Sequence, residues 1–212
     1  MKRILFQGDS ITDTARNREA KTGFNAYGCG YTNFVAGELC VEAPGAVEFY
    51  NRGVSGDRVV DLYARWRRDC IQLKPDVISI LIGVNDVWHE LGSGNGVPPK
   101  RFEKVLRMLI EETREELPGV KFMLMEPFLL HGSATNEHYD AFFPEVRTRA
   151  EIVERLAKEY DIPFIPLQSV FDEALQVADD KHWAIDGVHP SHAGHALIAK
   201  QWIAAYKKYI AE

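Results

Sequence analysis

The alternation of short apolar runs with longer segments of helical period constrains the fold of this 212-residue chain more than any other feature. The run Asp76–Gly83 (DVISILIG) is almost uninterrupted in apolar residues, as expected of a strand with helices on both faces of its sheet. Four more segments predict strands: Arg3–Gly8, Ala46–Asn51, Lys121–Glu126 and Ile162–Pro166. The apolar period predicts helices at Tyr31–Val41, Val59–Ile71, Arg101–Leu117, Tyr139–Tyr160 and Ser191–Tyr209.

This order of elements predicts an α/β fold with a five-stranded parallel sheet, because strands that alternate with helices are joined by right-handed crossovers. No repeat, low-complexity tract or linker interrupts the pattern, so we expect one domain over residues 1–212. Ligands of such sheets bind beyond the carboxyl ends of the strands. The segments that follow the strands are therefore where functional residues are expected.

Composition and charge exclude several classes of function. The 25 Lys and Arg residues against 31 Asp and Glu residues give a net charge of −6, which disfavours nucleic acid as a partner. The apolar runs are far shorter than the ~20 residues that span a bilayer, so no membrane association is expected. The N-terminal run Ile4-Leu5-Phe6 stops at Gln7, too early for a secretory signal, and we expect a cytoplasmic protein.

The three cysteines, Cys29, Cys40 and Cys70, include no CxxC pair. Free thiols in a reducing compartment are the simplest interpretation, and the sequence assigns them no role.

Polar residues follow the first three predicted strands. Ser10, in Gly8-Asp9-Ser10-Ile11, is placed either as a nucleophile at a helix entrance or as an ordinary helix cap. The segment Asn51–Gly56 holds two glycines, which let a backbone N–H approach a ligand or simply form a loop. Asn85, in the expected loop Gly83–Trp88, is either a rigid side-chain donor or a turn residue.

Asp186 and His189 lie three residues apart near the C-terminus. A carboxylate at this spacing can hold the imidazole through Nδ1–H and leave Nε2 to accept a proton, although a helix-entry loop would have the same sequence. The four segments meet at one edge of the predicted sheet. Together they supply a nucleophile, a base, an orienting carboxylate and oxyanion donors, which are the groups that acyl transfer needs.

In this order the four segments resemble the SGNH hydrolase family, also called the GDSL esterases and lipases. The matching residues are Gly8-Asp9-Ser10-Ile11 (with Ile in place of the family's Leu), Gly53, Gly83-x-Asn85-Asp86 and Asp186-x-x-His189. The resemblance implies a three-layer α/β/α sandwich with a flavodoxin-like sheet. It also implies that Ser10 is the nucleophile, His189 the general base and Asp186 its orienting partner. The implied oxyanion hole consists of the Ser10 N–H, the Gly53 N–H and the Asn85 side chain.

Within this family the chain is similar to intracellular acetylxylan esterases. The similarity lies in Gly83–Trp88, in Tyr27-Gly28-x-Gly30-Tyr31 and in Trp183 shortly before Asp186. It implies a small ester substrate, an acetylated sugar such as a xylo-oligosaccharide. Asp9, Trp88 and Trp183 are candidate substrate-binding residues, since an indole face suits a sugar ring, although a Trp is often simply buried.

Other functions remain open at this stage. A broad short-chain esterase or thioesterase, including a lysophospholipase-like enzyme, would differ only in its leaving group. A catalytically silent binding module could share the fold. A metal-dependent hydrolase could use His192 and His195, but no HExxH-like pattern accompanies them, and we expect no metal or cofactor. The two last predicted helices carry apolar residues that could form a homo-oligomer interface.

Overall fold

A parallel five-stranded sheet runs through the centre of the computed structural model, which describes residues 1–20, 23 and 25–211. The order across the sheet is β2-β1-β3-β4-β5, the flavodoxin-like order, and each neighbouring pair is parallel. The α/β fold predicted from the sequence is therefore confirmed. The strands are β1 (Lys2–Gly8), β2 (Val47–Asn51), β3 (Val77–Leu81), β4 (Lys121–Met125) and β5 (Phe164–Ile165).

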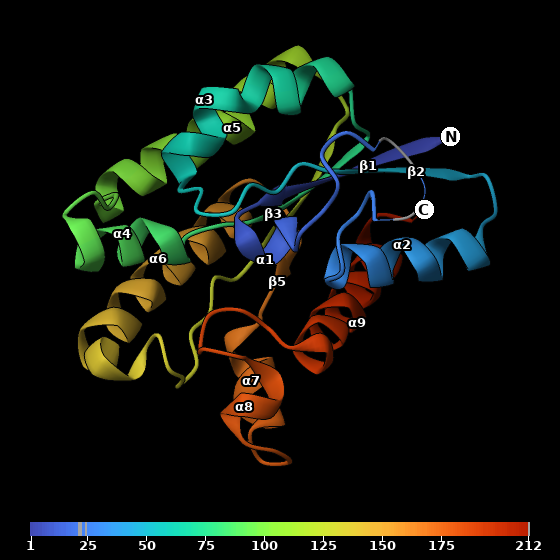
Figure 1. The fold of residues 1–212 in the computed structure, drawn as a ribbon. Coiled ribbons are helices and arrows are strands. Elements are labelled where there is room, and N and C mark those ends of the chain that lie inside the picture. Colours follow the sequence, from blue (N-terminus) through green and yellow to red (C-terminus); the bar gives the residue numbers. More distant parts are fainter. Residues whose placement is uncertain (21–22, 24, 212) are drawn as a thin grey trace.

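Helices cover both faces of this sheet and complete three layers (Figure 1). One face is covered by α2 (Tyr31–Glu42) and α9 (His192–Tyr209). The other is covered by α3 (Val59–Asp69), α5 (Pro99–Glu116) and the second half of α6 (Tyr139–Glu159).

Side chains of the strands alternate between the two layers. In β1, Ile4 and Phe6 pack towards α2 and α9, whereas Leu5 packs towards α3. All three are fully buried. Both faces of the central strands are therefore apolar, which explains the uninterrupted apolar run that marks β3 in the sequence.

Several helices were not predicted. Segment 83–88, expected as a loop, begins α4 (Val84–Ser93), and the segment Gly8-Asp9-Ser10-Ile11 that follows β1 leads into α1 (Ser10–Asp13). A four-residue helix is too short to show an apolar period. Helix α4 does have one, at Val84, Val87, Trp88 and Leu91, but Gly83, Asn85 and Asp86 at its start are residue types typical of turns. The remaining elements are α7 (Gln168–Ala174), α8 (Asp180–Trp183) and the 3₁₀ turns η1 (Ile71–Leu73) and η2 (Asn136–His138).

Among the described residues, no helix has both the length and the hydropathy that crossing a membrane requires. The three cysteines are free: Cys29 and Cys40 are exposed, and Cys70 is buried.

Candidate active site

Ser10 lies at the first position of α1, directly beyond the carboxyl end of β1. The Asp9 carboxylate caps this helix by accepting the Ile11 N–H at 3.0 Å. A side chain at Gly8 would collide with the Leu81 carbonyl oxygen and with Thr12, so only glycine allows so tight a turn between strand and helix. The sequence Gly-Asp-Ser therefore places the hydroxyl at the edge of the sheet and leaves a helix N-terminus beside it.

Ser10, His189 and Asp186 form a continuous chain of hydrogen bonds. The Ser10 Oγ lies 2.9 Å from the His189 Nε2, and the His189 Nδ1 lies 2.8 Å from the Asp186 Oδ2. The other carboxylate oxygen of Asp186 accepts the backbone N–H groups of Val188 at 3.0 Å and His189 at 2.8 Å. Both oxygens of the carboxylate are therefore committed to holding the imidazole in place.

The electrostatics of this pair favour a charged carboxylate. Burial raises the pKa of Asp186, but the hydrogen bonds from the His189 ring and from two backbone N–H groups outweigh it and lower the pKa to about 2. The bond from Asp186 in turn raises the pKa of His189 above 6.5, against the effect of its partial burial. An imidazole held in this way can take a proton from the serine and becomes stabilised as the imidazolium.

The turn that carries Asp186 and His189 is locked against the segment after β4. The Leu130 N–H donates to the Gly187 carbonyl at 2.9 Å. A Cβ at Gly187 would lie 2.6 Å from the Leu130 carbonyl oxygen and would collide with Thr135, and the Gly187 φ is +97°. Glycine is therefore required between the two functional residues of this turn.

The three predicted oxyanion donors differ in whether their N–H groups are already hydrogen-bonded. The Ser10 N–H, at the helix start, has no acceptor among the described residues. The Asn85 side chain donates one N–H to the Asp57 carbonyl at 3.1 Å and keeps a second N–H. The Gly53 N–H is already used, because it donates to the Asn51 Oδ1 at 2.9 Å.

The environment of Asn51 explains why the Gly53 N–H is taken. The Asn51 amide nitrogen donates to the carbonyls of Thr12 at 2.6 Å and Tyr27 at 2.9 Å, which turns the amide oxygen towards Gly53. Gly53 itself packs so closely on α1 that a Cβ would collide with the Asp13 backbone. In this structure Gly53 is thus a packing glycine, and its N–H is not open to an oxyanion.

Gly56, the second glycine of the same loop, was not singled out from the sequence. Its φ is +87°, a Cβ would meet nothing within 4 Å, and its N–H has no acceptor in the described part of the chain. The residue after it, Asp57, holds the Asn85 side chain, and the Val54 N–H binds the Gly8 carbonyl at 3.0 Å. The only sequence signal was the pair of glycines in one short loop.

Asp9 does not lie where a substrate-binding residue would. Its side chain is 1% exposed, and its Oδ2 is buried with no hydrogen-bond partner among the described residues. Burial raises its pKa to about 7. Asp86, which accepts the Val59 N–H, is also buried, and its pKa is likewise raised to about 7. The Asp9 carboxyl group therefore lies beneath the surface in this structure, and its burial does not support the expectation that Asp9 contacts substrate.

The two tryptophans differ in their positions. The Trp88 ring is half-buried, with its centroid 6.0 Å from that of His189. The Trp183 indole N–H donates to the carbonyls of Ala174 at 3.1 Å and Ala178 at 3.2 Å, so it ties α8 to α7. Only Trp88 lies close to the hydrogen-bonded serine and histidine.

A cavity of about 270 Å³ opens over the hydroxyl. Ser10, His189, His192, Cys29 and Ile185 are among the residues that line it. His195 lies at the same cavity, where burial lowers its pKa to about 4 and its Nδ1 accepts the Tyr31 N–H at 3.3 Å. Within residues 1–20, 23 and 25–211, no three His, Cys, Asp or Glu side chains are grouped so as to hold a metal ion.

The chain is similar to known proteins in sequence and in structure. The model of the GDSL-like lipase/acylhydrolase family matches residues 6–197. An acetylxylan esterase from Geobacillus stearothermophilus is 37% identical over 208 residues, 95% of this chain and 92% of that protein. Among solved structures, one described as a GDSL-like lipase from Parabacteroides merdae has a TM-score of 0.92 and 40% identity, and it covers 97% of this chain and 95% of its own. A crystal structure of an acetylxylan esterase from G. stearothermophilus has a TM-score of 0.86 and 37% identity, with 96% and 93% covered.

Proposed function

The chain belongs to the GDSL-like lipase/acylhydrolase family and is a carboxylic ester hydrolase, and from this premise we propose that it removes acetyl groups from carbohydrates such as xylo-oligosaccharides. The observation that carries the proposal is the unbroken hydrogen-bond chain from the Ser10 hydroxyl through His189 to Asp186. The similarity to an acetylxylan esterase over 95% of the chain supports the substrate class.

In the proposed mechanism, His189 acts first as a base and then as an acid. Its Nε2 takes the Ser10 proton as the Oγ attacks the ester carbonyl, and Asp186 stabilises the imidazolium that forms. The imidazolium then protonates the leaving alcohol, and an acetyl-Ser10 intermediate remains. Water, deprotonated by the same nitrogen, releases acetate and restores the hydroxyl.

We assign the oxyanion to the Ser10 N–H, the Asn85 side chain and the Gly56 N–H. The first and last have no acceptor among the described residues, and Asn85 keeps one N–H. Gly53 is left out of this set because Asn51 occupies its N–H. Preorganised donors of this kind stabilise charge that appears only in the transition state.

A small ester suits the cavity at Ser10. Its volume of about 270 Å³ lies below the roughly 300–1,000 Å³ of sites that enclose drug-sized ligands. One feature favours a second candidate function, a broad short-chain esterase: Ile185, which lines this cavity, is 69% exposed and offers an apolar surface to an apolar leaving group.

The experiment that separates these functions measures acid release from three kinds of ester: peracetylated xylosides, acyl-CoA thioesters and p-nitrophenyl esters of graded chain length. We expect acetate release from the xylosides and a steady fall in rate from acetyl to octanoyl esters. A rate that rises with acyl length, or a preference for the thioesters, would overturn the proposed substrate.

A further inference from the structure

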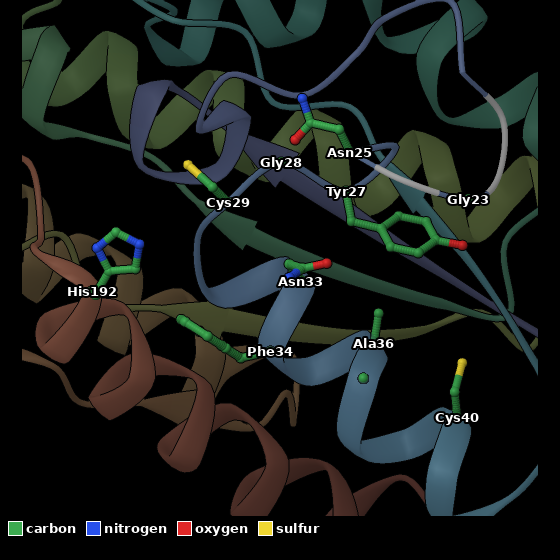
Figure 2. Close-up of a pocket in the computed structure, with 11 residues that line it drawn as sticks. Gly23, Asn25, Tyr27, Gly28, Cys29, Asn33, Phe34, Ala36, Cys40 and His192 are labelled. Atoms are coloured by element: carbon green, nitrogen blue, oxygen red, sulfur yellow. The ribbon is translucent and has the colours of Figure 1, made fainter.

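A second and larger cavity adjoins the one over Ser10. It has a volume of about 540 Å³ and lies between the backbone near Tyr27, the helix α2 and the first residue of α9, His192 (Figure 2). Cys29 and His192 line both cavities, and Figure 2 shows them together at one end of the larger one. The two hollows are thus neighbours that share a boundary.

The proposed chemistry fixes which part of an ester points towards this boundary. His189 must protonate the leaving alcohol, so that alcohol lies on the imidazole side of the Ser10 hydroxyl. The cavity that holds both groups also contains Cys29 and His192, where the larger cavity begins. A leaving group too large for the first cavity can therefore extend into the second.

The walls of the larger cavity suit an uncharged, hydroxyl-rich ligand. Tyr27 and Phe34 are half-buried and contribute aromatic surface, on which the C–H face of a sugar ring can pack. Asn33 and His192 contribute polar side chains that make no hydrogen bond to any described residue. None of the described lining residues is Asp, Glu, Lys or Arg, so these residues offer a phosphate group no carboxylate, ammonium or guanidinium partner and suit a neutral ligand better.

Gly37 lines this cavity and, having no side chain, takes up none of its volume. It lies inside α2, where glycine destabilises a helix relative to alanine, and it is exposed. A Cβ at Gly37 would meet nothing within 4 Å, so packing does not require glycine at this position. A larger residue there would project into open space next to the cavity.

A cavity of about 510 Å³ on the other side of Ile185 is less suited to a sugar. His131 and Asn136 line it and bond to each other at 3.0 Å, and the His131 N–H donates to the Asp180 carboxylate at 3.2 Å. Its polar groups are therefore largely satisfied within their own loops. Lys181 and two aspartates also give it charge that a neutral sugar does not need.

We propose that the 540 Å³ cavity between Tyr27, α2 and His192 is the subsite for the sugar part of the leaving alcohol, and that it binds the uncharged pyranose ring next to the acetylated one. This inference rests on the proposed function, because it takes Ser10 and His189 as the reacting groups. The subsite makes the enzyme faster on an acetylated disaccharide than on an acetylated monosaccharide.

The substitution Gly37→Leu tests the subsite by adding a bulky side chain at its wall. Gly92→Leu is the matched control: Gly92 is an exposed glycine in α4 whose Cβ would also meet nothing within 4 Å. The kcat/KM is measured for acetylated xylobiose, acetylated xylose and p-nitrophenyl acetate. We expect Gly37→Leu to lower the kcat/KM on the disaccharide about tenfold, as for the loss of good contacts in one pocket, and to leave p-nitrophenyl acetate within about twofold of the control.

A second variant tests the polar contact. Asn33→Ala removes a side chain that bonds to no described residue, so the fold is expected to tolerate it. It should raise the KM for acetylated xylobiose about threefold to tenfold, as expected when one hydrogen bond is lost, with an unchanged KM for p-nitrophenyl acetate.

The outcomes separate the subsite from the proposed function. If the wild-type protein hydrolyses neither acetylated xylose nor p-nitrophenyl acetate, the proposed function fails. If it hydrolyses both, but Gly37→Leu matches Gly92→Leu on the disaccharide, only the subsite is wrong. A loss of equal size on all three esters would also overturn the subsite, since the effect would then be general.

Discussion

At the scale of single residues, Asn85 offers the simplest test of the proposed oxyanion hole. Its side chain is held by the Asp57 carbonyl and keeps one N–H for a ligand. We predict that Asn85→Ala lowers kcat by about 10²–10³, or about 2.7–4 kcal/mol, with little change in KM, because the donor acts mainly in the transition state. Asn95→Ala, just beyond the same helix, is the matched control. Steady-state kinetics on p-nitrophenyl acetate decide the matter, and a kcat near that of the control removes Asn85 from the hole.

The pKa of His189 is expected to set the pH dependence of the reaction. Only the neutral imidazole can take the Ser10 proton, so activity is lost as the pH falls through the pKa of His189. The bond from Asp186 raises that pKa, so the midpoint of the acid limb is expected above 6.5. His195 does not produce this limb, since its pKa lies at about 4.

The variant Asp186→Asn is expected to shift the midpoint of this acid limb to lower pH. It removes the negative charge that raises the pKa of His189, so the pKa falls, while kcat drops by about 10⁴, as in serine proteases. An NMR titration of His189 in the wild-type protein and the variant measures both values. An unchanged His189 pKa in the variant contradicts the assigned pairing.

At the scale of elements, Gly187 is the residue on which the Asp186 to His189 turn depends. We predict that Gly187→Ala destabilises the protein by more than the roughly 1–2 kcal/mol that a left-handed backbone alone costs a non-glycine residue, because its Cβ also collides with Leu130 and Thr135. Gly119→Ala is the control: its φ is +91°, but nothing lies within 4 Å of its Cβ. Denaturant unfolding compares the two, and equal losses mean that the turn has room to adjust.

The apolar period predicted the sheet and the long helices because these elements bury whole faces. It is also present in the ten-residue helix α4, but Asn85 and Asp86 at the start of this helix are residue types typical of turns and favour a loop there. In the structure the Asp86 carboxylate accepts the Val59 N–H at this helix start. The strand-end positions of Ser10 and Asn85 followed from topology alone.

The positions that sequence reasoning missed depend on how individual side chains are oriented, and the Asn51 amide is oriented by the distant carbonyls of Thr12 and Tyr27. Gly53 and Gly56 are both glycines of one loop, and the sequence does not distinguish them. In the structure the Asn51 side-chain oxygen accepts the N–H of Gly53 and not that of Gly56. Asp9 likewise adjoins the proposed nucleophile in sequence, while its carboxyl group is buried beneath the site. Side-chain orientation in loops is set by such neighbours, which periodicity does not report.

At the scale of the whole molecule, two buried carboxyl groups, Asp9 and Asp86, lie at the edge of the sheet. Their burial lowers the free energy of unfolding of the protein at neutral pH. Burial raises the pKa of Asp9 and of Asp86 from 3.8 to about 7, and the charge of Asp9 also raises the pKa of Asp86. The folded protein therefore holds protons that the unfolded chain releases. The contribution of these two groups to the free energy of unfolding is therefore largest below pH 3.8, and it is lost as the pH rises to about 7.

The variant Asp9→Asn isolates one of these groups, because an amide oxygen can still accept the Ile11 N–H and carries no titratable proton. We predict that the free energy of unfolding of the variant, relative to the wild-type protein, rises steadily between pH 4 and pH 7 and stays level above it. The total gain should be on the order of a few kcal/mol, which corresponds to the raised pKa. Urea unfolding at each pH measures the difference, with Asp140→Asn, an exposed carboxylate on α6, as the control. A difference that is constant with pH means that the Asp9 carboxyl group is ionised in the folded protein as it is in the unfolded chain, and that solvent reaches it despite its burial.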